Sequence, residues 1–234
     1  MILRALVAAA LVLLPALALA GRPLSTEDAS TLDDTACQLE SWVNRSRGDV
    51  DDFSFVPACA LFGVEWQAGG ARTREAGSSA LTAAFVQGKH AFRSVDDGDW
   101  GYGLVVGLTR FPKREAKNDW GDPYLLVPVS VGLGEDKETR ALLHLNVGTA
   151  RLRDEARNLT LWGVALEKPV TGRLTLLGEA FGENATKPFL RAGGRYTLFD
   201  KFDVDLTWVT RSGGTKEERY WSVGFHWETD PLRP

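Results

Sequence analysis

Beyond its first twenty residues, the chain has no apolar run that approaches the ~20 residues of a membrane-spanning helix. It has three histidines and two cysteines, and it lacks a phosphate-binding loop, a CxxC motif and an HExxH motif. It also lacks an excess of positive charge: without Arg4, 26 basic residues (27 − 1) face 31 acidic ones, a net charge of −5. We therefore expect no cofactor, no bound metal and no nucleic-acid partner, which would need a basic face.

The first twenty residues have the three regions of a secretory signal peptide. Arg4 supplies the positive charge, Ala5–Leu17 the apolar stretch, and residues 18–20 the small-residue cleavage site. The apolar stretch is short for a membrane anchor, and no cysteine follows the cleavage site, which argues against a lipoprotein. We expect an exported mature protein that starts at Gly21.

From about Ala36 to Trp227, the chain is a series of short segments in which apolar and polar residues alternate. In the last segment, Trp221, Val223 and Phe225 share one face, while Ser222 and His226 lie on the other. A period of two predicts a β-strand between two different environments. Twelve such strands are predicted, over residues 36–44, 52–60, 63–72, 81–92, 100–111, 124–133, 140–151, 159–167, 173–181, 189–198, 202–210 and 220–227.

Many alternating strands behind a secretory signal are typical of a closed antiparallel up-and-down transmembrane β-barrel in the bacterial outer membrane. Ten strands is the alternative count, because only Leu61 and Phe62 separate the second strand from the third. A tandem of soluble β-sandwiches would alternate too. The inner faces, however, carry charge and glycine, and aromatic residues gather near strand ends, as in an interfacial girdle: Trp42, Trp66, Trp100, Tyr102, Trp162, Trp208, Trp221 and Trp227.

The expected organisation is a signal peptide (1–20), a polar N-terminal extension (21–35), the barrel (36–227) and a short C-terminal tail (228–234). The extension has no periodicity, so it is either disordered or tucked into the lumen. Outer-membrane lipid and the barrel-assembly machinery are the expected partners, with small-molecule solutes as a further possibility.

The parity of the strands places a cluster of charged residues on the inner face. Acidic and basic members from neighbouring strands should pair, because an unpaired buried charge is costly. The cluster either fills and stiffens a closed barrel or forms a constriction that selects solutes. Inward glycines, such as Gly107, Gly132 and Gly163, are expected to leave room for a narrow pore. The predicted cluster comprises Glu40, Glu65, Lys89, His144, Glu167, Glu179, Arg191, Arg195, Asp203 and Asp205.

Both cysteines fit one hairpin. If residues 36–44 and 52–60 pair around a turn at Gly48, Cys37 lies directly opposite Cys59. Opposed residues of a non-hydrogen-bonded pair lie ~4.5 Å apart at Cα, which is within reach of a disulfide. An oxidising compartment favours this disulfide over two free, buried thiols.

The segments RPLSTEDA, ACQLESW, PACALFGVEW and LFDKFDVDLTW resemble proteobacterial outer-membrane proteins, grouped as transporters associated with the phenol meta-cleavage pathway. The resemblance covers most of the mature chain. It implies a β-barrel that transports small, for example aromatic, compounds, and it carries over no catalytic residues. One departure is the end of the chain, where seven residues follow Trp227, although barrel chains typically stop at an aromatic residue.

Three functions are compatible with these features. The first is a narrow passive channel for small solutes, and the second is a closed barrel with a structural role or a role in binding through its loops. The third is an outer-membrane enzyme that uses His144 or His226, which the lack of a recognisable serine–histidine spacing disfavours.

Overall fold

The computed structural model describes residues 22–46, 50–75, 78–112, 121–137, 139–216 and 218–232. The expected signal peptide, Gly48 and most of the loop 112–123 lie outside these ranges. No helix in the described part of the chain is long and apolar enough to cross a membrane.

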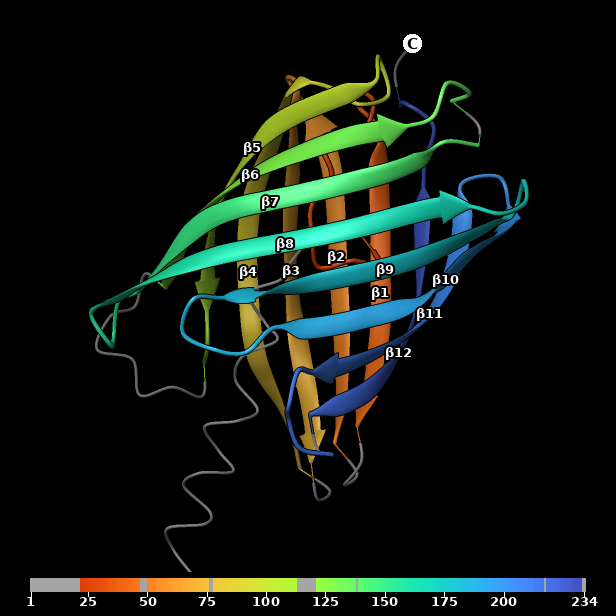
Figure 1. Ribbon diagram of the computed structural model, residues 1–234. Coiled ribbons are helices and arrows are strands. Elements are labelled where there is room, and N and C mark those ends of the chain that lie inside the picture. The colour runs from red at the N-terminus through yellow and green to blue at the C-terminus, as the bar shows by residue number, and fades with distance from the viewer. Residues whose placement is uncertain are drawn as a thin grey trace, which may run out of the picture.

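The described residues form one closed antiparallel barrel of twelve strands (Figure 1). Each strand pairs with its neighbours in sequence, and the last pairs with the first, with Gln38 opposite Glu228. The expected fold and the count of twelve are confirmed, and strand boundaries differ from expectation by up to three residues. The strands are β1 (Cys37–Ser46), β2 (Asp51–Leu61), β3 (Val64–Glu75), β4 (Ser78–Arg93), β5 (Trp100–Arg110), β6 (Asp122–Leu133), β7 (Ala141–Leu152), β8 (Arg157–Pro169), β9 (Leu174–Glu183), β10 (Phe189–Phe199), β11 (Phe202–Arg211) and β12 (Arg219–Glu228).

The outer surface of the barrel is apolar. Phe53, Val147, Leu206 and Val223 each keep about half of their surface exposed, at 48%, 58%, 51% and 54%. Their neighbours in sequence point inward and are polar or small, which is the pattern that places lipid outside and water inside. An exposed apolar surface this large is typical of a protein that spans a membrane.

One of the expected girdle residues lies inside instead. Trp42 has the same parity as Gln38 and Glu40, and the guanidinium of Arg22 lies 4.9 Å from the centre of its ring. The charge of Arg22 against the ring face is a favourable cation–π contact, and Arg22 is itself buried in the lumen.

The tight junction between β2 and β3 has a local explanation. Phe62 and Gly63 both have positive φ, at 58° and 72°. Two central residues with positive φ form the type I′ turn, whose twist matches that of the flanking strands. Two residues are therefore enough to reverse the chain, and the count of strands is even.

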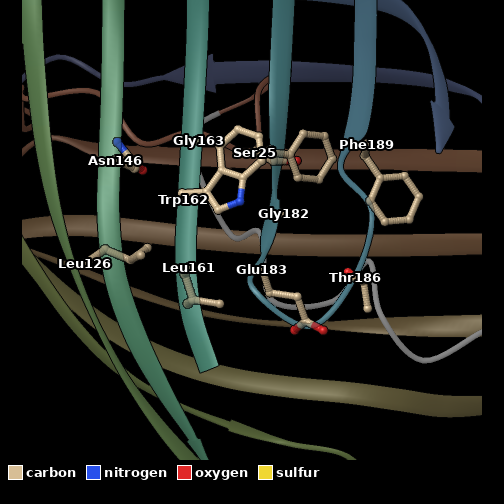
Figure 2. Close-up of a pocket in the computed structure, with 11 residues that line it drawn as sticks. Ser25, Leu126, Asn146, Leu161, Trp162, Gly163, Gly182, Glu183, Thr186 and Phe189 are labelled. Atoms are coloured by element: carbon tan, nitrogen blue, oxygen red, sulfur yellow. The ribbon is translucent and has the colours of Figure 1, made fainter. Parts of the chain in front are cut away.

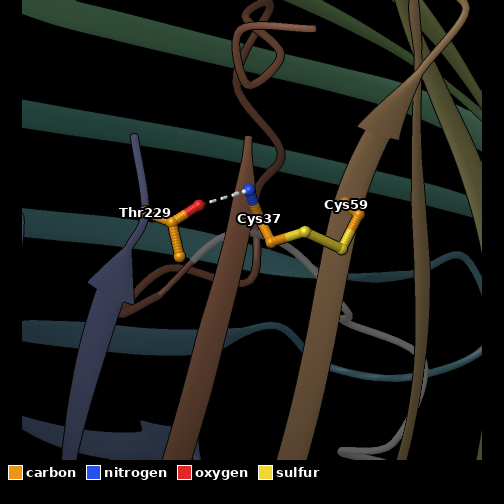
Figure 3. Close-up of a disulfide and its surroundings, with 3 residues drawn as sticks. All are labelled: Cys37, Cys59 and Thr229. Atoms are coloured by element: carbon orange, nitrogen blue, oxygen red, sulfur yellow. Dashed lines mark hydrogen bonds between the residues drawn. A yellow bond between two sulfur atoms is a disulfide. The ribbon is translucent and has the colours of Figure 1, made fainter. Parts of the chain in front are cut away.

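The disulfide between Cys37 and Cys59 is present, with the Cα atoms 4.0 Å apart. The two residues are register partners on β1 and β2, as the hairpin predicts. Figure 3 shows Thr229, directly after β12, beside the same disulfide, and its Oγ1 accepts a hydrogen bond of 3.0 Å from the amide of Cys37. The disulfide thus lies at the seam where the barrel closes. We call this end of the barrel, where β1 begins and β12 ends, the terminal end.

Candidate functional site: the lumen and its N-terminal segment

Residues 22–35, which we call the lumenal segment, lie inside the barrel. Arg22, Leu24 and Ala29 are buried, and Glu27 is 0% exposed. Leu24 packs in an apolar cluster with Ala165 of β8 and Leu177 of β9. Of the two conformations expected for the polar extension, the structure shows the tucked one.

Backbone amides of the lumenal segment are bonded to inward side chains all around the wall. The acceptors belong to β1, β9, β7, β6 and β3, so the segment crosses the lumen rather than lining one side. Because a buried amide without a partner is costly, these side chains make a specific cradle. The bonds run from Arg22 to Glu40 (2.8 Å), from Ser25 to Glu179 (2.7 Å), from Glu27 to Asn146 (2.8 Å), from Ala29 to Ser130 (2.8 Å) and from Leu32 to Glu65 (3.0 Å).

Two ion pairs tie the segment to the wall. The guanidinium of Arg22 pairs with Asp205 of β11, and the two side chains are 4% and 3% exposed. Lys89 of β4 lies between Glu27, at 3.2 Å, and Asp28. Burial raises the pKa of Glu27, and the Lys89 ammonium only partly offsets this. Burial also acts to raise the pKa of Asp28, but there the ammonium prevails and holds the pKa well below its usual range.

Glycines of the wall provide the space that this segment fills. A β-carbon on Gly163 of β8 would collide with Thr26, and one on Gly224 of β12 would collide with the guanidinium of Arg22. The expectation that inward glycines leave an open pore is therefore wrong for this conformation. Gly107 is likewise covered by the ring of Tyr124, and Gly132 by the side chain of Arg140.

The charged residues predicted for the lumen lie on the inner face, and their partners differ in part from expectation. Arg191 of β10 pairs with Glu179 of β9 at 3.2 Å, as adjacency suggests. Arg195 pairs with Glu167 of β8 at 2.6 Å and lies 3.9 Å from Asp203. The partner of Asp205 is Arg22, 183 residues away, rather than an arginine of β10.

Two uncharged inward residues that hold the segment lie outside the predicted charge cluster. Gln87 of β4 donates a 3.0 Å hydrogen bond to Glu27, and Asn146 of β7 both accepts from and donates to the Glu27 backbone. The inward parity of Gln87 and Asn146 could be read from the alternation. Their role could not, because the segment they bind has no periodicity to align.

Two of the histidines are engaged in polar contacts within the lumen. His144 Nδ1 lies 2.8 Å from Ser130 Oγ, and its Nε2 lies 3.9 Å from Glu167. Ser130 is 0% exposed and accepts the amide of Ala29, so a substrate has no access to this hydroxyl. His226 Nε2 lies 3.1 Å from Gln38 Oε1. Within the described ranges, no three His, Cys, Asp or Glu residues are grouped to hold a metal ion.

Two cavities in the described part of the chain border the lumenal segment. The larger, of 420 Å³, lies at the terminal end of the barrel, and we call it the terminal cavity; its lining is mostly polar. The smaller, of 50 Å³, lies between Ser25 and the wall, and Figure 2 shows the aromatic rings of Trp162 and Phe189 beside it. The lumen is therefore partly hollow on the terminal side of the segment.

A closed barrel with an apolar exterior and a polar, charged lumen is the architecture of bacterial outer-membrane β-barrel proteins. Within that class, the chain belongs to the family described as Uncharacterised conserved protein UCP029691, whose model matches residues 8–227. No curated protein matches the sequence.

Solved structures with the same fold include outer-membrane porins and channels. The KdgM porin superposes with a TM-score of 0.60 at 7% identity, over 82% of this chain and 99% of that chain. The COG4313 outer-membrane channel of Pseudomonas putida F1 gives 0.54 at 9%, over 86% and 98%. The NanC porin gives 0.54 at 8%, over 82% and 98%. At identities this low, the superpositions show a shared fold alone.

Proposed function

We propose that the protein is a narrow passive channel for small solutes in the bacterial outer membrane, closed in the described conformation by its lumenal segment. One observation carries this proposal: a piece of chain that belongs to no strand crosses the lumen, and glycines of the wall leave room for it. A barrel of twelve strands lies between those filled by their own side chains and those with an aqueous channel. Displacement of the lumenal segment would therefore open a path.

The fold shared with porins and channels supports the same function. One of those structures is the KdgM porin in complex with disordered oligogalacturonate, a polyanion. The terminal cavity here is lined by more carboxylates than cationic groups, so a polyanion is a poor candidate for this chain. The resemblance to transporters of the phenol meta-cleavage pathway makes small aromatic compounds solutes to test. We infer outer-membrane lipid and the barrel-assembly machinery as partners.

Planar-bilayer recording tests the proposal with the full mature chain and a variant that lacks residues 22–33. The wild-type protein should show rare or small openings, because the segment blocks the lumen. The deletion variant should conduct more and stay open longer. A folded deletion variant that never conducts would show that the wall itself closes the barrel, and the channel proposal would fail.

A closed barrel that binds through its loops is the second candidate, and the many bonds of the lumenal segment favour it. In that case, removing residues 113–120 should abolish the binding of a partner to the loops, while the permeability of the membrane to small solutes stays the same. We propose no catalytic activity, since the hydroxyl of Ser130 is covered by Ala29. A double variant, His144→Ala/His226→Ala, that keeps the wild-type channel activity would support this.

A further inference from the structure

We propose that the terminal cavity binds a small organic cation that carries a primary ammonium or guanidinium group. The inference deepens the proposed function by naming a class of solute, and it rests on that function only for passage through the lumen. The cavity, of 420 Å³, is lined by the lumenal segment together with inward residues of the surrounding strands.

The balance of charge around the cavity is acidic. Three permanently cationic residues line it, and each is already paired: Arg22 with Asp205, Lys89 with Glu27 and Asp28, and Arg195 with Glu167. The carboxylates outnumber them, and His226 is the one further titratable base in the described lining. The acidic lining residues are Asp28, Asp33, Glu40, Glu65, Asp96, Glu167, Asp203 and Glu228.

Glu40 is the second, separate observation, because it is deeply buried yet incompletely bonded. Its side chain lines the cavity, and the residue is 3% exposed. It accepts one hydrogen bond, from the amide of Arg22 to Oε1. No described residue donates to its other carboxylate oxygen, and none forms an ion pair with it. Arg22 and His226, its register partner on β12, act on this carboxylate electrostatically without forming an ion pair. The buried charge is therefore only partly compensated, and it gains from a cation in the cavity.

Glu65 of β3 also lines the cavity, and its hydrogen bonds involve other residues than those of Glu40. It is 3% exposed and accepts from the amide of Leu32 and from the side chains of Gln38 and Gln67. None of these donors is a cation, and the ammonium of Lys89, the register partner of Glu65, is held by Glu27 and Asp28. Two buried carboxylates, Glu40 of β1 and Glu65 of β3, therefore act on a bound cation together.

The dimensions and the chemistry of the lining favour an organic cation over a metal ion. No described group of three His, Cys, Asp or Glu residues converges as metal ligands. A primary ammonium has three donors and needs several acceptors around it, which the dispersed carboxylates offer. Leu24 and Leu32 also line the cavity and supply apolar contacts for a short alkyl chain.

Calorimetric titration of the full mature chain in detergent micelles tests the site, with 1,5-diaminopentane as the probe. Pentane-1,5-diol and glutarate serve as the neutral and anionic controls of equal length. The diamine should bind, and the two controls should bind about tenfold more weakly or not at all, because a charge-assisted bond is about twice as strong as a neutral one. Equal heats for diamine and diol would overturn the proposal.

The matched variants are Glu40→Gln and Glu135→Gln. Glutamine at position 40 keeps an oxygen for the amide of Arg22 and removes only the charge, so the fold and the lumenal segment should be retained. Glu135 is exposed in the turn after β6 and lies outside the cavity lining. We expect Glu40→Gln to weaken diamine binding about tenfold, the scale of one charge-assisted contact, while Glu135→Gln leaves it unchanged. Unchanged binding in Glu40→Gln would overturn the site.

Competing salt and bilayer recording separate the remaining outcomes. Loss of diamine binding in equimolar KCl would show a site for any monovalent cation and overturn the organic class. Diamine binding to the full chain, with no conductance from the folded variant that lacks residues 22–33, would support the site and contradict the channel. If the protein conducts cations and anions equally well and does not bind the diamine, the proposed cation site is wrong and the proposed channel function stands.

Discussion

The side chain of Thr26 occupies the space that a β-carbon on Gly163 would need. The same relationship holds between Arg22 and Gly224 of β12, four strands around the wall from β8. The lumenal segment thus fits two glycine sites, and five of its backbone amides donate hydrogen bonds to five strands. This specific fit indicates that the segment is an ordered part of the closed conformation.

Replacing Gly163 with valine should displace the lumenal segment while leaving the barrel intact. Overpacking costs about 1–3 kcal/mol, and about 1.4 kcal/mol corresponds to a tenfold change in the open population. A single cysteine placed by Leu24→Cys reports this, because residue 24 is buried and the described native cysteines are both in the disulfide. Maleimide labelling should be about tenfold faster in the Gly163→Val background.

Gly178 provides the control for that change. A β-carbon there meets no atom within 4 Å, so Gly178→Ala should leave the labelling rate at the wild-type value. Equal labelling rates in Gly163→Val and Gly178→Ala would mean that the fit at Gly163 does not hold the segment.

Asp205→Asn should loosen the segment by leaving the charge of Arg22 buried without its partner. Breaking one side of a buried pair costs about 3–5 kcal/mol, whereas replacing both members by apolar groups is often neutral. The variant should therefore label faster at residue 24, and the double variant Arg22→Met/Asp205→Leu should label close to the wild-type rate. Asp200→Asn, in an exposed turn, is the control. Fast labelling of the double variant would argue against this account of the pair.

Removing the disulfide should destabilise the seam of the barrel. The bond closes a loop with a sequence separation of 22 residues, for which the chain-entropy model gives about 3 kcal/mol. Cys37→Ser/Cys59→Ser should lower the midpoint of urea unfolding, and dithiothreitol should lower it in the wild type but not in the variant. An additional effect of dithiothreitol on the variant would point to another cause.

Gly63→Val should destabilise the turn between β2 and β3. A β-branched residue is strained at a φ of 72°, and strain of this kind costs about 1–3 kcal/mol. Gly172→Ala is the control, because a β-carbon there meets nothing within 4 Å and the residue has no positive φ. A folding yield for Gly63→Val equal to that of the control would contradict the type I′ assignment.

Alternation in the sequence was enough to derive the wall. The period of two comes from covalent geometry, so parity alone placed Leu206 toward lipid and Glu179 inside. The pairing of Cys37 with Cys59 followed from hairpin register in the same way, since antiparallel neighbours are set by local chain reversal. Only Trp42, which has the inward parity, was assigned to the wrong surface, because its position near a strand end was given more weight than its face.

The sequence by itself therefore determined a twelve-stranded barrel, the faces of its strands and its disulfide. The tertiary structure decided what fills that barrel. Residues 22–35 have no period, and their position depends on complementarity with side chains up to 183 positions away, such as Asp205. It also decided that the inward glycines receive Thr26 and Arg22 instead of leaving an open path, because a small residue provides space without specifying what occupies it.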